Sequence, residues 1–159
     1  MSSRKIEDLV PELQELYHKF ADKTKEAGLD FIVVCTARTV SEQRALYAQG
    51  RQSLNAVNSL RKEVGLPPIS EQENKRKVTW TRSSKHLTDK NNPKAKAFDI
   101  VLKNPNGTVH WNTKLDNNNN GIPDYIEIGE IGESVGLKWG GRFSSPDFPH
   151  FEIPEQEVK

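Results

Sequence analysis

The sequence contains few of the features that would suggest a disulfide-bonded or membrane-spanning protein. Its 159 residues include one cysteine, which excludes an intrachain disulfide framework and a zinc site built from several thiolates. Any transition-metal site must therefore use histidine and carboxylate ligands. No segment approaches the roughly 18 consecutive apolar residues that a membrane span requires, so we expect no membrane partner.

The chain also lacks an excess of charge of either sign. Lys and Arg number 23 and Asp and Glu number 22, which gives a net charge of +1. Because proteins that bind nucleic acid through its phosphates are usually strongly basic, we expect no nucleic-acid partner. The amino-terminal segment carries acidic residues throughout and has no apolar stretch typical of a secretory signal. We therefore expect synthesis in the cytoplasm without a signal peptide.

The residues that are present suffice for one folded domain, residues 1–159. Three Trp, three Tyr and six Phe can build a hydrophobic core, and the length is that of an ordinary domain. Apolar periodicity, β-branched runs and turn residues predict helices at 6–20, 41–50, 54–64 and 125–135, and strands at 30–36, 78–82 and 97–102. Residues 51–77 are expected to form a mobile excursion and 85–96 a polar loop. The irregular order of helices and strands predicts a small α+β domain.

Three residues stand in settings that favour a metal site. His86 precedes the polar loop, His150 lies near the end of the chain, and Asp99 interrupts an apolar strand, where a carboxylate is costly unless it is paired or bound to metal. A catalytic zinc usually takes three protein ligands and leaves one position for water. Asp147, three residues before His150, could accept a proton from that water. The spacing alone leaves the alternative open that the histidines are ordinary surface or core residues and that Asp99 caps a turn.

Five motifs in order suggest a family. They are Ala37-Arg-Thr39 with Gln43, Ser84-Lys-His86, Ala97-Phe-Asp99, Trp139-Gly-Gly141 and Asp147-Phe-Pro-His-Phe-Glu152. Together they resemble the zinc peptidases that cut peptidoglycan stem peptides, above all the L-alanyl-D-glutamate endopeptidases of phage endolysins and bacterial wall enzymes. The resemblance covers about residues 6–153. It implies a hedgehog/D-Ala-D-Ala metallopeptidase-like fold, with a mostly antiparallel sheet and flanking helices.

The resemblance also implies roles for individual residues. His86, Asp99 and His150 would bind Zn²⁺, and Asp147 would be the catalytic base. Arg38 would stabilise the oxyanion of the tetrahedral intermediate or hold a substrate carboxylate.

Three further residues would complete the cleft. Gln43 and Ser84 would support the site or the substrate, and Trp139 would form a wall. The plainer interpretations are that Arg38 and Gln43 are surface residues at the start of a helix and that Trp139 belongs to the core.

The sequence departs from the family pattern in one place. Twelve residues, Leu87 to Phe98, separate the first histidine from the aspartate, where the family usually has six. The extra residues, around Thr88–Lys94, are expected to be a loop insertion. Asp89 is a rival zinc ligand, but the strand context favours Asp99.

A second metal motif lies between residues 116 and 127. Its residue types match the twelve-residue calcium loop of EF-hands, with oxygen ligands at positions 1, 3, 5, 7, 9 and 12 and glycine at position 6. The proposed Ca²⁺ ligands are Asp116, Asn118, Asn120, the carbonyl of Ile122, Asp124 and Glu127. The alternative is an Asn-Gly turn that leads into a helix capped by Asp124.

These observations predict a monomeric, zinc-dependent, endolysin-like hydrolase that cleaves the L-Ala–D-Glu bond of the peptidoglycan stem peptide. The enzyme would reach the cell wall after release from the cytoplasm. The nearest alternative is a D-Ala-D-Ala carboxypeptidase or dipeptidase. An alternative of another class is a catalytically silent metal-binding module that recognises the wall.

Overall fold

A five-stranded sheet organises the structure, a computed structural model that describes residues 2–79 and 84–155. The longest strand, β4 (Ala97–Lys103), pairs on one side with β1 (Phe31–Cys35). On its other side lie β7 (His150–Glu152) and β5 (Val109–His110), and β6 (Lys138–Trp139) follows β7. These pairings are all antiparallel, which confirms the predicted α+β class and its mostly antiparallel sheet.

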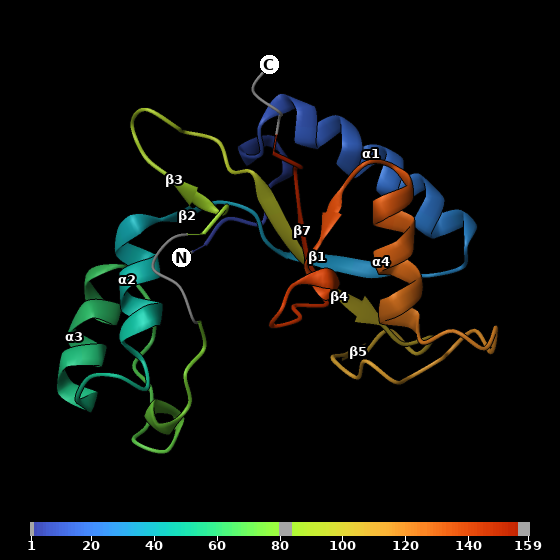
Figure 1. Cartoon of the computed structure of the whole chain (residues 1–159). Helices are drawn as coiled ribbons and strands as arrows, with labels where there is room; N and C mark the ends of the chain where they lie inside the picture. The colour runs from blue at the N-terminus through green and yellow to red at the C-terminus, as the bar shows by residue number, and fades with distance from the viewer. Residues whose placement is uncertain (1, 80–83, 156–159) are drawn as a thin grey trace.

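Two helices, α1 (Pro11–Glu26) and α4 (Asp124–Ser134), cover one face of this sheet and contact each other (Figure 1). Because successive side chains of a strand alternate between faces, Phe98, Ile100 and Leu102 of β4 all point toward these helices and are buried. The ring of Phe20 from α1 lies 5.6 Å from that of Phe98 and 4.8 Å from that of Phe151. This core leaves the opposite face of β4 available for polar residues.

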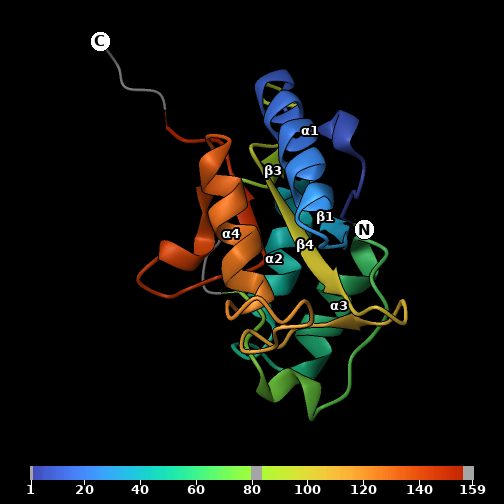
Figure 2. The same ribbon diagram turned by 90° about the vertical axis from the view of Figure 1, so that its right-hand side faces the viewer.

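A second group of elements lies away from α1 and α4. It consists of α2 (Val40–Ala48), α3 (Leu54–Glu63), the short 3-10 helix η2 (Glu73–Lys75) and a parallel pair of strands, β2 (Arg38–Thr39) and β3 (Leu87–Thr88). In Figure 2, α1 and α4 lie in front of the sheet and α2 and α3 behind it. The β2–β3 pair brings two distant motifs together, because the Arg38 amide donates to the His86 carbonyl at 2.8 Å.

Most predicted elements occur, with corrected ends. The first helix begins at Pro11 rather than at residue 6, where a 3-10 turn, η1 (Ile6–Asp8), forms instead. The second helix is capped by Thr39, whose Oγ1 accepts from the Glu42 amide at 3.1 Å, and not by Ser41. The loop predicted at 85–96 contains β3.

Residues 51–77, predicted as an excursion, contain α3 and η2. The strand predicted at 78–82 falls largely outside the described residues. In the described ranges, no helix has both the length and the apolar character needed to cross a membrane. The remaining short 3-10 helix, η3 (Gly140–Arg142), introduces the loop before β7.

Candidate active site

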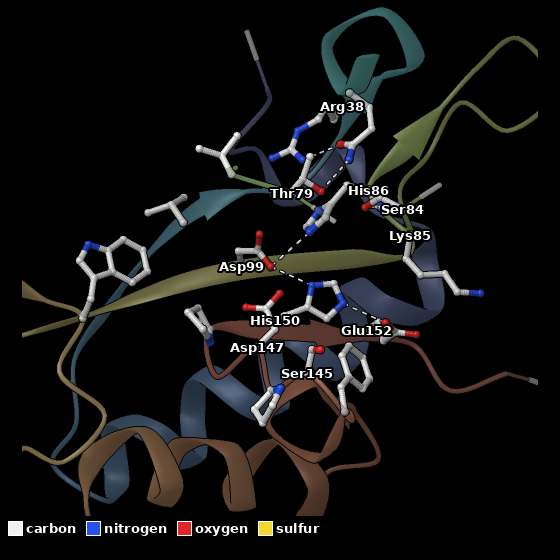
Figure 3. Close-up of a pocket in the computed structure, with 17 residues that line it drawn as sticks. Arg38, Thr79, Ser84, Lys85, His86, Asp99, Ser145, Asp147, His150 and Glu152 are labelled. Atoms are coloured by element: carbon white, nitrogen blue, oxygen red, sulfur yellow. Dashed lines mark hydrogen bonds and ion pairs between the residues drawn. The ribbon is translucent and has the colours of Figure 1, made fainter. Parts of the chain in front are cut away.

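Three side chains converge on the open face of the sheet. Asp99 of β4 pairs directly with His150 of β7, so their side chains project from the same face. His86, just before β3, reaches the same point from the other side. Asp99 Oδ1 lies 3.2 Å from His86 Nε2 and 2.9 Å from His150 Nδ1 (Figure 3). The fold thus brings together the three residues predicted as zinc ligands.

Hydrogen bonds on the outer side of each ring set the orientation of the imidazoles. His86 Nδ1 lies 2.7 Å from the carbonyl oxygen of Thr36, which can only accept, so this nitrogen donates. His150 Nε2 lies 2.8 Å from Glu152 Oε1. A metal-binding histidine commonly donates its outer N–H to such an acceptor and presents the lone pair of its other nitrogen to the metal.

The donor set therefore fits zinc. His86 Nε2 is buried and has no partner of good hydrogen-bond geometry among the described residues, although it faces the Asp99 carboxylate. Two imidazole nitrogens and one carboxylate oxygen are the ligands of many catalytic zinc sites.

Without a metal, protonation of His86 and His150 compensates the negative charge of Asp99. Burial by itself lowers the pKa of His86, but its close polar contact with Asp99 and the attraction of that carboxylate outweigh burial and raise the pKa to about 10. Burial also opposes the charge on His150, yet Asp99 and Glu152 raise its pKa to about 9. Burial disfavours the Asp99 carboxylate as well, and the two histidines nevertheless hold the pKa of this group well below its usual range. The site therefore stabilises positive charge where the metal would lie.

Asp147 lies beside this cluster on the loop before β7. Ligand atoms of Asp99, Asp147 and His150 lie within 4.8 Å of one another. Burial and the negative charge of Asp99 raise the pKa of Asp147 above its usual value. A carboxylate with a raised pKa accepts a proton more readily near neutral pH, which suits a general base.

A glycine keeps this loop close to the sheet. The amide of Asp147 donates to the carbonyl of Gly140 at 2.8 Å. A Cβ at position 140 would lie 2.4 Å from the carbonyl oxygen of Asp147 and 2.9 Å from the Cβ of His150. Because these distances are well inside van der Waals contact, we expect any side chain at Gly140 to displace both Asp147 and His150.

The site opens into a cavity of about 640 Å³ that also takes in Arg38, Gln43 and Ser84. Arg38 Nη1 donates to Gln43 Oε1 at 2.8 Å, and Arg38 Nη2 contacts Cys35 Sγ at 3.4 Å. Ser84 Oγ accepts from the His86 amide at 3.1 Å, which supports the zinc ligand. The remaining lining residues are Val34, Val78, Thr79, Lys85, Trp111, Phe143, Ser145, Pro146, Pro149 and Glu152. The roles predicted for Arg38, Gln43 and Ser84 stay predictions.

Trp139 was expected to wall the cleft, and the structure places it in the core instead. Its side chain is 2% exposed, and it is absent from the cavity lining. Its ring packs where Gly129 and Gly141 leave room for it, since a Cβ on either glycine would lie within 2.3 Å of the indole. The indole N–H donates to the Phe148 carbonyl at 2.8 Å, so Trp139 supports the Asp147 loop from beneath.

Glu152, Cys35 and Trp111 are among the neighbours of the site that have no predicted role. Glu152 follows His150 by two residues in β7, and strand alternation in the sequence could have placed both on one face. Cys35 Sγ lies 3.7 Å from His86 Nδ1. Trp111 lies in a polar segment with no recognisable motif, so no sequence signal pointed to it.

The rival ligand Asp89 lies elsewhere. Its Oδ1 accepts from the amides of Asn91 and Asn92 at 2.8 Å each, which caps an exposed turn within the predicted insertion. The alternative that Asp89 replaces Asp99 as a zinc ligand is therefore wrong.

The candidate calcium loop has a different character from the zinc site. Asn118 Nδ2 and Asn120 Nδ2 donate to Glu127 Oε1 at 3.0 and 2.6 Å, and Asp116 Oδ2 accepts from the Gly121 amide at 2.9 Å. Gly121 has φ of 85°, as the sharp turn at position 6 requires.

Position 9 of the loop, Asp124, is 2% exposed, and its Oδ1 lacks a partner among the described residues. Burial raises the pKa of Asp124, with smaller effects from the charges of Asp116 and Glu127. The carboxylates of the loop do not form a group of three within 4.8 Å in the described part of the chain.

Comparison with known proteins confirms the class that the motifs and the site predict, a metallopeptidase. A family model described as D-alanyl-D-alanine carboxypeptidase matches residues 78–153, which include all three candidate zinc ligands and Asp147.

Two individual proteins are similar to the chain. Peptidoglycan L-alanyl-D-glutamate endopeptidase CwlK of Bacillus subtilis (strain 168) is 27% identical to this chain, and the match covers 96% of this chain and 81% of that protein. The solved structure of the LdcB LD-carboxypeptidase matches with a TM-score of 0.46 and 14% identity over 91% of this chain. The match spans 58% of that longer chain.

Proposed function

We propose that the chain is a zinc-dependent, endolysin-like peptidoglycan hydrolase that cleaves the stem peptide between L-Ala and D-Glu. The observation that carries this proposal is the convergence of His86 Nε2, Asp99 Oδ1 and His150 Nδ1 beside the Asp147 carboxylate. The choice of bond is supported by the similarity to CwlK, whose name specifies an L-alanyl-D-glutamate endopeptidase.

The residues of the site divide the chemistry between them. When bound by His86, Asp99 and His150, zinc would supply the positive charge that polarises the scissile carbonyl and makes water more acidic. Asp147 takes the proton of the attacking water at its carboxylate and later delivers it to the departing amine. Arg38 reaches the cavity as a fixed cation that stabilises developing negative charge or holds a substrate carboxylate.

Mass spectrometry of muropeptides after digestion of purified peptidoglycan tests the bond. We expect new fragments with a free D-Glu amino group. Asp147→Asn should lower the rate by about 10²- to 10⁴-fold, because it removes the base and keeps its shape. The same variant should still bind one zinc per chain. Asp89→Asn, which changes an exposed carboxylate outside the cavity, is the matched control and should keep full activity.

The digestion also separates the alternatives. Loss of a terminal alanine would support a D-Ala-D-Ala carboxypeptidase, which the description of the matching family model favours. Absence of any cleavage by the zinc-loaded chain would support a silent wall-binding module. The joint presence of Asp147 and Arg38 in the cavity argues against that module, since recognition alone needs neither a base nor an oxyanion-stabilising cation.

We infer in addition that the 116–127 loop binds calcium. Support comes from the complete match of residue types to the calcium loop and from the buried, unpartnered Oδ1 of Asp124. In the structure, the side-chain amides of Asn118 and Asn120 point their Nδ2 atoms toward Glu127 Oε1. Binding requires both amides to turn their oxygens inward, which a rotation of the terminal side-chain bond accomplishes.

A further inference from the structure

The face of the sheet that carries Asp99 continues beyond the zinc ligands as an apolar surface. Val101 lies on the same face of β4, about 7 Å further along the strand, because side chains alternate. Ile32 of β1 pairs directly with Val101, and its side chain is 39% exposed. Val34, at the irregular end of β1, lines the cavity.

Trp111 extends this surface on the other side of β4. The register joins Leu102 to His110, the last residue of β5, and Trp111 follows directly in the chain. The His110 ring turns toward the helices and contacts Tyr125 at 5.5 Å between ring centroids. Trp111 turns the other way and lines the cavity that holds His86, Asp99 and His150.

The indole of Trp111 has the properties of a binding platform. Its side chain is 57% exposed, although tryptophan is usually among the well-buried residues. Among residues 2–79 and 84–155 its ring has no stacking partner and its N–H no hydrogen-bond acceptor. An exposed tryptophan offers a large apolar face together with one polar donor, the combination that suits a ligand with both kinds of surface.

We propose that the surface formed by Trp111, Ile32 and Val34 binds the muramic acid sugar that carries the stem peptide. This proposal rests on the proposed cleavage of the L-Ala–D-Glu bond. In that substrate the amino group of L-Ala is joined to the lactyl group of the sugar, so one residue separates the scissile bond from the carbohydrate. Ile32 pairs with Val101, which lies two residues, or about 7 Å, from Asp99 along β4, so the surface begins within the reach of one intervening amino acid.

Charge distribution in the cavity orients the substrate. The D-Glu side of the scissile bond bears a free carboxylate, which is attracted to the Arg38 guanidinium beside Gln43 and Thr79. The sugar side bears C–H groups and an acetyl methyl, which pack on an indole face, and hydroxyl oxygens that accept from its N–H. The apolar surface is therefore complementary to the sugar side and not to the D-Glu side.

The test compares two substrates: a muramoyl peptide, and the same peptide with an acetyl group in place of the sugar. We expect Trp111→Ala to lower kcat/KM on the muramoyl peptide by about 3- to 10-fold and to leave the acetyl peptide unchanged. Trp111→Phe keeps an aromatic face and should retain most of the activity. Val109→Ala, which shortens an exposed apolar side chain of β5 outside the cavity, is the matched control.

Binding is measured independently of cleavage by the quenching of tryptophan fluorescence. The muramoyl peptide should quench the unmodified chain and the Asp147→Asn variant but not Trp111→Ala. Equal losses on both substrates, or quenching that survives Trp111→Ala, would overturn the sugar site. Quenching that depends on Trp111 without cleavage between L-Ala and D-Glu would keep the sugar site and overturn the assigned bond.

Discussion

The two candidate metal sites of this protein are held by different kinds of structure, one by paired strands and the other by a loop. The candidate zinc ligands Asp99 and His150 lie on paired strands, and the Thr36 carbonyl orients His86, so the donor atoms of the three residues converge without a metal. The candidate calcium ligands lie on a mostly exposed loop and the start of α4; their polar side chains bond to one another, and their carboxylates do not form a group of three in the described part of the chain. A site held by a sheet is organised in advance, whereas a site held by a loop must be organised by its ion.

Removal of zinc should produce the largest effect. Chelation should abolish hydrolysis and leave the fold intact, because the core between α1, α4 and the sheet does not include the ligands. Zinc at about 100 times its dissociation constant should raise Tm by roughly 5–10 °C. Loss of helical circular dichroism on chelation would contradict an organised apo site.

The pH dependence of stability should differ in sign with and without zinc. In the metal-free protein the pKa values of His86 and His150 are raised to about 10 and about 9, against about 6.5 in the unfolded chain. Their stabilisation is therefore complete below about pH 6.5 and is lost as the pH rises through the folded values. Zinc binding requires both histidines to lose these protons, so the increase of Tm caused by zinc should grow with pH. Thermal scans at pH 6.5, 7.5 and 8.5, with zinc and with chelator, measure both trends.

A change outside the ligands should have an intermediate effect. Glu152→Gln keeps an acceptor for His150 Nε2 but removes the negative charge that makes the imidazole a better ligand. We expect zinc affinity to fall by about 10-fold, and by up to about 100-fold for Glu152→Ala. Competition with a chromogenic chelator measures this affinity, with Glu130→Gln, a change at an exposed residue of α4, as the control. Unchanged affinity in both Glu152 variants would show that strand pairing alone orients His150.

The calcium loop should give the smallest effect. Calcium should raise Tm by about 2–4 °C through contacts that the apo loop lacks. Glu127→Gln removes the bidentate ligand and should cancel that increase, while its zinc content stays at that of the unmodified chain. A calcium-dependent Tm that persists in Glu127→Gln, or its absence in the unmodified chain, would contradict binding at this loop.

The contrast between the two sites also explains how far sequence reasoning reached. His86, Asp99, Asp147 and His150 could be grouped because an aspartate in an apolar strand and ordered motifs leave a local signal. Glu152 was within reach, since its spacing from His150 places both on one face of β7. Trp139 was misplaced, because an aromatic residue beside two glycines fits a cleft wall as well as a packed core. Trp111 left no signal, because its position depends on the pairing of β5 with β4.

By itself, the sequence determined the α+β class, the positions of its main helices and strands, and the exclusion of a metal site built from several thiolates, because the chain has a single cysteine. These properties follow from local periodicity and residue chemistry, because both can be read from residues that are close together in the sequence. Only the tertiary structure decided that Trp139 is buried and that Trp111 opens onto the cavity. Each of these depends on the register between strands far apart in the chain, because a shift of one residue would turn every side chain to the opposite face.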